Sequence, residues 1–193
     1  MIHCKDILAV LLSYAIGCVC IGYYVTRFWT GEDIRKFGSG SAGARNVGRK
    51  LGKTGYAFTL IGDLAKGALA MWIVSMMHIN PWAVVLSLTA VAAGHIWPVQ
   101  LGFRGGKGIA VTLGGLLVFD LWIAVGCCLI FGLCLAFVRR YIISGLAAIA
   151  AMPVMTIVAG HSALDILGIG LLAVIILFAH RANVKDIVHT RSS

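Results

Sequence analysis

The chain has 193 residues, of which 60% are hydrophobic and 12% are charged, with a mean hydropathy of +0.96. A soluble domain carries about twice that share of charged residues, so the composition indicates a polytopic membrane protein. The net charge of +9 favours anionic lipid surfaces and anionic ligands, while no basic stripe interleaved with aromatic residues supports a nucleic-acid partner.

The apolar segments, taken in chain order, predict an all-α polytopic integral membrane protein with seven transmembrane helices and a single membrane domain, residues 1–193. A helix needs about 20 mostly apolar residues to cross a bilayer. The run 109–138 is too long for one crossing, and Asp120 near its middle predicts a tight turn between two helices. The expected spans are about 6–28, 55–77, 81–101, 109–119, 121–138, 141–160 and 163–179.

The Lys and Arg residues lie almost entirely on one side of this arrangement. Of the 16, only Lys5 lies on the other side and only Lys66 lies within a span. Short loops rich in Lys and Arg stay in the cytoplasm. We therefore expect the N-terminus outside, the C-terminus in the cytoplasm, and the polar segments 29–54, 102–108 and 180–193 on the cytoplasmic face.

The segment 102–108, between the third and fourth spans, is typical of a phosphate-binding loop. Its four glycines let backbone N–H groups approach an oxyanion, and Arg104 and Lys107 add positive charge. Lys107 also lies where the next helix begins, and a helix N-terminus favours anions. It is not a nucleotide-binding Walker A loop, because Leu101 occupies the first Gly position and Gly108 replaces the hydroxyl residue. A Gly-rich turn whose cations face lipid headgroups is the alternative.

Two further cytoplasmic segments have the same character. Residues 38–49 combine small residues, the hydroxyl of Ser39 and two arginines, Arg45 and Arg49, and the last span ends at His180 and Arg181. Arginine offers a planar fork that suits phosphate. Each segment alone could be an ordinary positively charged loop, but the three together favour a polyanion site.

Three motifs follow one another along the chain, with a further Asp63-x-x-Lys66-Gly67 in the second span. They are Gly38-Ser39-Gly40 with Gly43-Ala44 and Asn46-x-x-Arg49; Gly94-His95-x-x-Pro98 with Phe103-x-Gly105-Gly106-Lys107-Gly108-x-Ala110; and His180-Arg181-x-Asn183. Their order and spacing resemble those of the bacterial acyl-phosphate:glycerol-3-phosphate acyltransferases, the PlsY family. The departures are Ser41 in place of the usual Asn, Arg45 and Val111 in place of Thr, and Thr190-Arg191-Ser192 in place of a C-terminal Gly-x-Glu.

The resemblance implies transfer of a fatty acyl group from acyl phosphate to the 1-hydroxyl of sn-glycerol 3-phosphate. The products would be lysophosphatidic acid and phosphate, in the first step of phospholipid biosynthesis, at the bacterial cytoplasmic (inner) membrane. It implies catalytic roles for His180, Asn183 and Ser39. It places substrate or phosphate binding on Ser39, Gly40, Asn46, Arg49, Arg104, Gly105, Gly106, Lys107, Gly108 and Arg181. We expect a multi-pass monomer with no metal, no organic cofactor and no nucleic-acid partner.

The alternative is a membrane transporter or channel for phosphate or a phosphorylated solute. It rests on Asp63 and Lys66, which share one helix face in the middle of the second span. Unpaired charges there cost several kcal/mol, so the two should pair or face a polar interior (about 2.5–3.5 kcal/mol on insertion scales). We interpret His95 as a packing residue near the 102–108 loop, and expect Asp120 and Asp165 to be solvated at outer turns.

Overall fold

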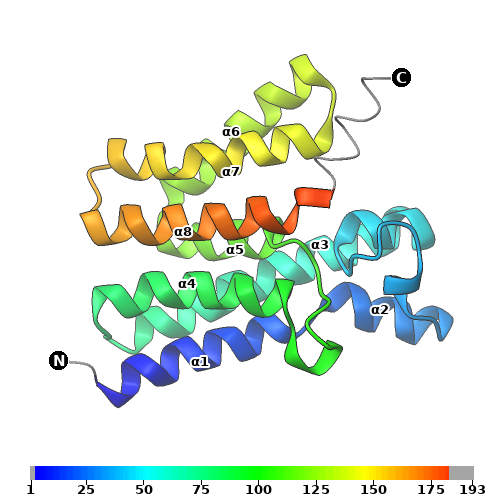
Figure 1. Ribbon diagram of the computed structural model, residues 1–193, viewed down its shortest axis with the longest axis horizontal. Helices are drawn as coiled ribbons and strands as arrows, with labels where there is room; N and C mark the ends of the chain where they lie inside the picture. Colours follow the sequence, from blue (N-terminus) through cyan, green and yellow to red (C-terminus); the bar gives the residue numbers. More distant parts are fainter. Residues whose placement is uncertain (1–2, 183–193) are drawn as a thin grey trace. The chain divides into compact units, whose positions relative to one another are not determined.

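The computed structural model describes residues 3–182, and every regular element within that range is helical (Figure 1). The chain divides into a first unit, Met1–Phe119, and a second unit, Asp120–Ser193. The expectation that they form one membrane domain stays a prediction.

The first unit pairs α1 with α4 and α3 with α5 (Figure 1). Its elements are α1 (Cys4–Cys18), α2 (Ile21–Thr30), the short 3-10 helix η1 (Ile34–Lys36), α3 (Ala44–Met76), α4 (Pro81–Ile96), the 3-10 helix η2 (Val99–Leu101) and α5 (Ile109–Phe119).

Both helix pairs rely on glycine for close approach. A Cβ added at Gly17 of α1 would lie 2.2 Å from the carbonyl oxygen of Val91 in α4. A Cβ added at Gly114 of α5 would lie 2.0 Å from the carbonyl oxygen of Leu64 in α3. Small residues at such contacts let backbones pack directly, which drives helix association where lipid removes the hydrophobic effect.

The first three helical segments differ from the predicted spans. The first is broken between Cys18 and Ile21, where the backbone leaves helical geometry. The helix α3 begins at Ala44 rather than near residue 55, and Gly52 kinks it with a φ of 71°. The predicted loop 29–54 therefore contains a helical segment. The third helix ends at Ile96 because Pro98 disfavours helical geometry in the residue before it.

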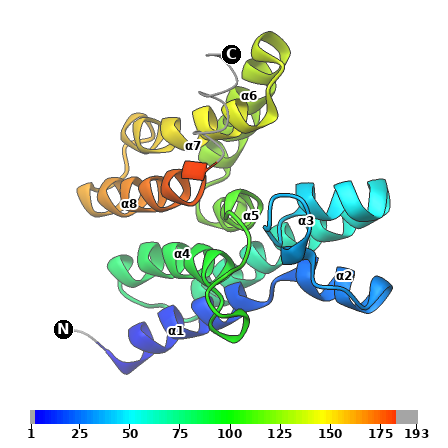
Figure 2. The ribbon, with the colours of Figure 1, turned by 45° about the vertical axis from the view of Figure 1, so that its right-hand side comes forward.

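The second unit consists of α6 (Leu121–Val138), α7 (Tyr141–Val158) and α8 (Ala163–Ala179), with α7 packed against both others (Figure 2). The turn predicted at Asp120 is confirmed. Asp120 precedes α6 with a φ of −157°, and its carboxylate accepts a hydrogen bond of 3.0 Å from the Ile123 N–H. A side-chain acceptor at this position satisfies a backbone donor that the helix itself leaves unpaired.

Within residues 3–182, five helical stretches are long and apolar enough to cross a membrane. They are Cys4–Thr30, Ala44–Met76, Pro81–Leu101, Leu121–Val138 and Tyr141–Val158. Two shorter apolar helices, Ile109–Phe119 and Ala163–Ala179, occupy the other two predicted spans. The number of crossings and their orientation stay predictions.

Candidate functional site

The structure brings the first two Gly-rich segments together in the first unit. The Ala42 N–H donates a 3.0 Å hydrogen bond to the carbonyl oxygen of Gly105. A second connection runs from Arg35 in η1, whose Nη1 donates to the carbonyl oxygen of Leu101 at 2.5 Å. The loop before α3 and the loop before α5 are therefore neighbours, as a shared anion site requires. We call residues 37–43 the first loop and residues 102–108 the second loop.

Asn46 holds the first loop in shape. Its Nδ2 donates to the carbonyl oxygens of Ile34, Phe37 and Ser41 at 2.9–3.2 Å, and its Oδ1 accepts a 3.0 Å hydrogen bond from the Ser39 N–H. The side chain is buried. Its amide therefore serves the loop backbone, a role that the sequence did not reveal, and direct phosphate binding by Asn46 stays a prediction.

Arg35 and Asp33 form the anchor of the first loop. Arg35 Nε lies 3.0 Å from Asp33 Oδ1, and Nη2 lies 2.7 Å from Oδ2, so the pair is bidentate. The guanidinium also lies 5.0 Å from the ring centroid of Tyr23 in α2. Hydrogen bonds from the Arg35 side chain, which outweigh the opposing effect of partial burial, hold the pKa of the Asp33 carboxyl below its usual range.

The second loop lies directly on the end of α4. The Gly106 N–H donates to the carbonyl oxygen of His95 at 2.9 Å, and the Gly105 N–H donates to that of Ile96 at 3.1 Å. There is no room for side chains here: a Cβ added at Gly105 would lie 2.1 Å from His95 O, and one at Gly106 would lie 1.9 Å from His95 Nε2. The two glycines are therefore needed for close approach, and the expectation that His95 packs near this loop is confirmed.

Two helix N-termini and several cations surround the connected loops. The helices α3 and α5 begin at Ala44 and Ile109, directly after the first and second loops. Such ends leave backbone N–H groups without helical partners and favour negative charge. Arg49 and Arg104 are exposed, and Lys107 is half-buried. A Cβ added at Gly38 would lie 3.9 Å from Arg49 Nη1, so the Arg49 guanidinium lies beside the first loop. Exposed Ser39, with Gly40 at a φ of 68°, completes the arrangement.

The third motif lies at the C-terminal end of α8 in the second unit. His180 is buried, and its Nδ1 donates a 2.8 Å hydrogen bond to the carbonyl oxygen of Ile176. In a neutral ring this leaves the lone pair on Nε2, which is the state a general base needs. Arg181 is exposed and donates to the carbonyl oxygen of Phe178. Asn183 lies outside the described residues, and the association of this motif with the two loops stays a prediction.

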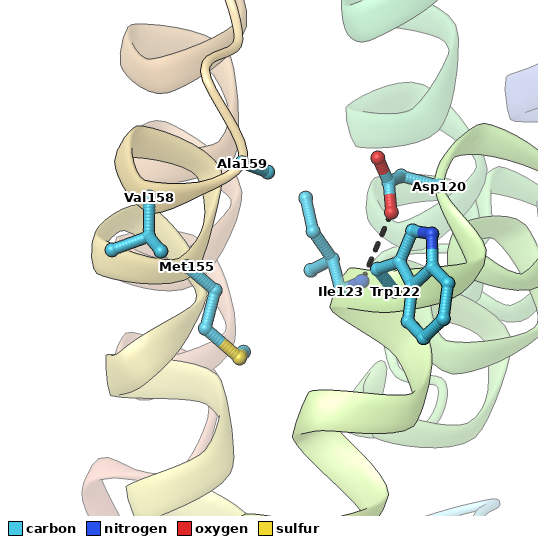
Figure 3. A pocket seen from close by; sticks show the side chains of 6 residues that line it. All are labelled: Asp120, Trp122, Ile123, Met155, Val158 and Ala159. Atoms are coloured by element: carbon cyan, nitrogen blue, oxygen red, sulfur yellow. Dashed lines mark hydrogen bonds between the residues drawn. The ribbon is translucent and has the colours of Figure 1, made fainter.

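A pocket of about 330 Å³ lies at the other end of the second unit, where α6 begins and α7 ends. Figure 3 shows its lining, which is apolar except for one carboxylate: Asp120, Trp122, Ile123, Met155, Val158 and Ala159. None of these residues is a cation, so the pocket does not suit a phosphate.

The expectation that Asp120 and Asp165 are simply solvated is wrong. His161 Nε2 lies 2.8 Å from Asp120 Oδ2, and Nδ1 lies 3.6 Å from Asp165 Oδ2. Both carboxylate side chains are 17% exposed. Burial works against ionisation of Asp120, but hydrogen bonds from the Ile123 N–H and His161 outweigh it and lower the pKa of this carboxyl.

The expected pairing of Asp63 with Lys66 is confirmed, with Nζ 2.9 Å from Oδ1 inside the first unit. The two buried charges therefore form an ion pair within the first unit. Sequence reasoning missed the Asp33–Arg35 anchor and the contact between Lys66 and His95. The first pair carries no motif that marks it, and the second joins helices that are far apart in the sequence.

The chain matches the family described as glycerol-3-phosphate acyltransferase over residues 7–190. It is 42% identical over 187 residues to glycerol-3-phosphate acyltransferase 1 of Desulfitobacterium hafniense (strain Y51), covering 97% of this chain and 93% of that protein. It is 37% identical to glycerol-3-phosphate acyltransferase 1 of Bacillus cereus (strain ATCC 14579), covering 94% of this chain and all of that protein.

A solved structure gives the same result. The crystal structure of PlsY (YgiH), an integral membrane glycerol 3-phosphate acyltransferase in its glycerol 3-phosphate form, superposes with a TM-score of 0.90 at 27% identity. The match covers 96% of this chain and 93% of that one. With its apolar helices, this chain is therefore a multi-pass membrane protein, and it belongs to the glycerol-3-phosphate acyltransferase family, whose members are acyltransferases of phospholipid biosynthesis.

Proposed function

We propose that this enzyme transfers a fatty acyl group from an acyl phosphate to the 1-hydroxyl of sn-glycerol 3-phosphate. The hydroxyl oxygen attacks the acyl carbonyl carbon and loses its proton. The bond between the carbonyl carbon and the phosphate oxygen then breaks, releasing lysophosphatidic acid and inorganic phosphate. An acyl phosphate is a mixed anhydride and already activated, so the reaction needs no covalent enzyme intermediate.

The observation that carries this proposal is the hydrogen-bonded pair of Gly-rich loops, each leading into a helix N-terminus. Both substrates end in a phosphate dianion, and bringing them together requires positive charge and backbone donors in one place. Arg49, Arg104 and Lys107 supply the charge. The Gly108 N–H and the first N–H groups of α3 and α5 suit phosphate oxygens and the oxyanion that forms during transfer. The N–H groups of Gly105, Gly106, Ser39 and Gly40 already donate within the protein, so these residues shape the two loops, and Ser39 adds its hydroxyl.

The catalytic roles of Ser39, His180 and Asn183 are part of the proposal and rest on the motif match. The Ser39 hydroxyl donates to a phosphate oxygen, while His180 Nε2 accepts the proton from the 1-hydroxyl. Asn183 has both a donor and an acceptor for a polyol hydroxyl, and Arg181 binds phosphate. The buried Nδ1–H bond of His180 supports its assignment, since it fixes the tautomer that leaves Nε2 basic.

The arrangement of the chain in the membrane is also a proposal. We infer seven crossings of the bacterial cytoplasmic (inner) membrane, an external N-terminus, a cytoplasmic C-terminus and a monomeric enzyme. The one-sided distribution of Lys and Arg supports this orientation, because it places both Gly-rich loops where soluble glycerol 3-phosphate is found.

The direct test uses purified protein with palmitoyl phosphate and labelled glycerol 3-phosphate. We expect labelled lysophosphatidate from palmitoyl phosphate and none from palmitoyl-CoA. Lys107→Ala and Arg49→Ala should each lower turnover about 10- to 150-fold, since a charge-assisted hydrogen bond contributes about 1.5–3 kcal/mol.

Lys53→Ala is the matched control. Like Arg49, Lys53 is an exposed cation in α3, but it lies outside the motif at residues 38–49. It should keep wild-type turnover. Product from palmitoyl-CoA alone would refute the acyl phosphate donor. Wild-type kinetics in both motif variants would refute the phosphate site. Uptake of phosphate into sealed vesicles without product would support a transporter instead.

A further inference from the structure

Asp63, Lys66 and His95 form a buried cluster inside the first unit. Lys66 Nζ lies 2.9 Å from Asp63 Oδ1 and 2.8 Å from His95 Nδ1. The three side chains are 2%, 6% and 3% exposed, respectively. Buried charges need partners, and the ion pair with Asp63 meets that need. The contact between Lys66 and His95 therefore calls for a separate explanation.

The Lys66 contact fixes the tautomer of His95. His95 Nδ1 lies 2.8 Å from Lys66 Nζ and 3.5 Å from Asp63 Oδ1, so the ammonium is its nearer partner. An ammonium group has donors and no acceptor, so Nδ1 accepts from it, and a neutral ring then has its proton on Nε2. That Nε2 edge faces Gly106 of the second loop: the three atoms nearest to an added Gly106 Cβ are His95 Nε2, Cε1 and Cδ2, at 1.9, 2.5 and 2.9 Å. The ring thus fills the space that a residue with a side chain would need.

The backbone of His95 also contacts the second loop. Its carbonyl oxygen accepts from the Gly106 N–H, and Gly105 in turn accepts from the Ala42 N–H of the first loop. His95 therefore contacts Gly106 through both its ring and its carbonyl group. Gly106 is the residue directly before Lys107. A shift of the ring displaces the peptide that leads into the proposed phosphate ligands.

Lys66 is held from its other side by the break between α1 and α2. Its Nζ donates to the carbonyl oxygens of Gly17 and Val19 at 3.2 and 2.7 Å. A cation suits carbonyl groups left without partners at a helix C-terminus. Lys66 is thus fixed by α1, α3 and α4 together, and its contact with His95 extends this rigid framework to the second loop.

We propose that Lys66 and His95 are positioning residues of the acyltransferase site, which set the place of Gly106 and so direct the second loop and Lys107 toward phosphate. This inference rests on the proposed function for its kinetic consequence. Misplacement of reacting or binding groups by about 1 Å can cost roughly 100-fold in rate. Neither residue touches the substrate in this proposal, so each acts through the second loop alone.

The test exploits the steric contact between Gly106 and the ring. Gly106→Ala should collide with His95 Nε2, whereas His95→Asn shortens the side chain and keeps an acceptor for Lys66. We expect Gly106→Ala to raise the KM for glycerol 3-phosphate about tenfold or more, with faster deuterium exchange across residues 102–108. The double variant His95→Asn with Gly106→Ala should recover most of both losses.

A second pair keeps the test informative if Gly106→Ala fails to fold. His95→Asn should change the KM less than His95→Leu, which removes the acceptor for Lys66. Gly132→Ala is the glycine control, since an added Cβ there meets nothing within 4 Å, and His78→Asn is the control at an exposed histidine. Both should match wild type in KM and exchange, with retained melting temperature checked throughout.

The outcomes separate this inference from the proposed reaction. If the double variant is no better than Gly106→Ala, or if His95→Asn and His95→Leu are both wild-type in KM and exchange, the positioning role is wrong. If the wild-type protein makes no lysophosphatidate while the exchange pattern follows expectation, the proposed reaction is wrong and the loop contact stands.

Discussion

Asn46 shows how one side chain can matter to a site that it does not enter. Its amide donates to the carbonyl oxygens of Phe37 and Ser41 in the first loop and of Ile34 in η1, and it accepts from the Ser39 N–H. A carboxylate at this position would offer acceptors where the loop needs donors. The same loop depends on Arg35, which connects η1 to the residue before the second loop.

The Asp33–Arg35 pair predicts a pH dependence of stability. The pKa of Asp33 is lowered in the folded protein, so the unfolded chain binds its proton more readily. The stabilisation is therefore present above the unfolded pKa of about 3.9 and is lost as pH falls through the folded value. We expect Asp33→Asn to lower the melting temperature at pH 7, with the gap to wild type closing below about pH 4.

Glu32→Gln is the control for this measurement. Glu32 also pairs with a cation, Lys50, but its side chain is 63% exposed. Exposed ion pairs contribute about 0–1 kcal/mol, so the melting curve of this variant should follow wild type at every pH. A gap for Asp33→Asn that is constant down to pH 2 would show that the carboxylate charge is unimportant.

At the scale of elements, glycine at helix contacts sets how closely α3 and α5 approach. Gly114→Ala would place a methyl group 2.0 Å from the Leu64 carbonyl oxygen, and backbone cannot move aside as a side chain can. We expect a loss of about 1–3 kcal/mol in unfolding free energy, typical of overpacking. Gly170→Ala in α8, where an added Cβ meets nothing within 4 Å, should be close to neutral in the same denaturation assay. Equal stability of the two variants would contradict the close packing.

Sequence patterns predicted the elements better than their ends. Hydropathy located the apolar segments, and Asp120 marked a real turn because a carboxylate before a helix accepts its first N–H groups. The break after Cys18 was missed, since the residues around it are as apolar as the helices themselves. The early start of α3 was missed because a polar, Gly-rich sequence gives no helical periodicity, and Gly52 interrupts it.

The motifs nominated the residues of the candidate site, whose roles stay predictions, but they gave no sign of how the loops are held. The sequence shows glycine at positions 105 and 106, but it does not show why a side chain is excluded there. The cause is close contact with His95, which depends on how α4 ends. Hydrogen bonds such as Ala42 to Gly105 join segments that no periodic pattern relates. Long-range contacts of this kind come from the packing of the first unit, which a single sequence does not encode in any local signal.

At the scale of the whole molecule, charge predicts the orientation in the membrane. All but two of the 16 Lys and Arg lie on the side expected to be cytoplasmic, which leaves Cys4, near the N-terminus, on the outside. Cys4 is exposed, as is Lys36, the last residue of η1. In intact cells, a variant whose sole cysteine is Cys4 should react with a membrane-impermeant maleimide. A cysteine-free protein carrying Lys36→Cys should react only after the membrane is permeabilised. The reverse labelling pattern would invert the topology and place both Gly-rich loops away from cytoplasmic glycerol 3-phosphate. Labelling of both cysteine positions from outside would rule out an odd number of membrane crossings between residues 4 and 36.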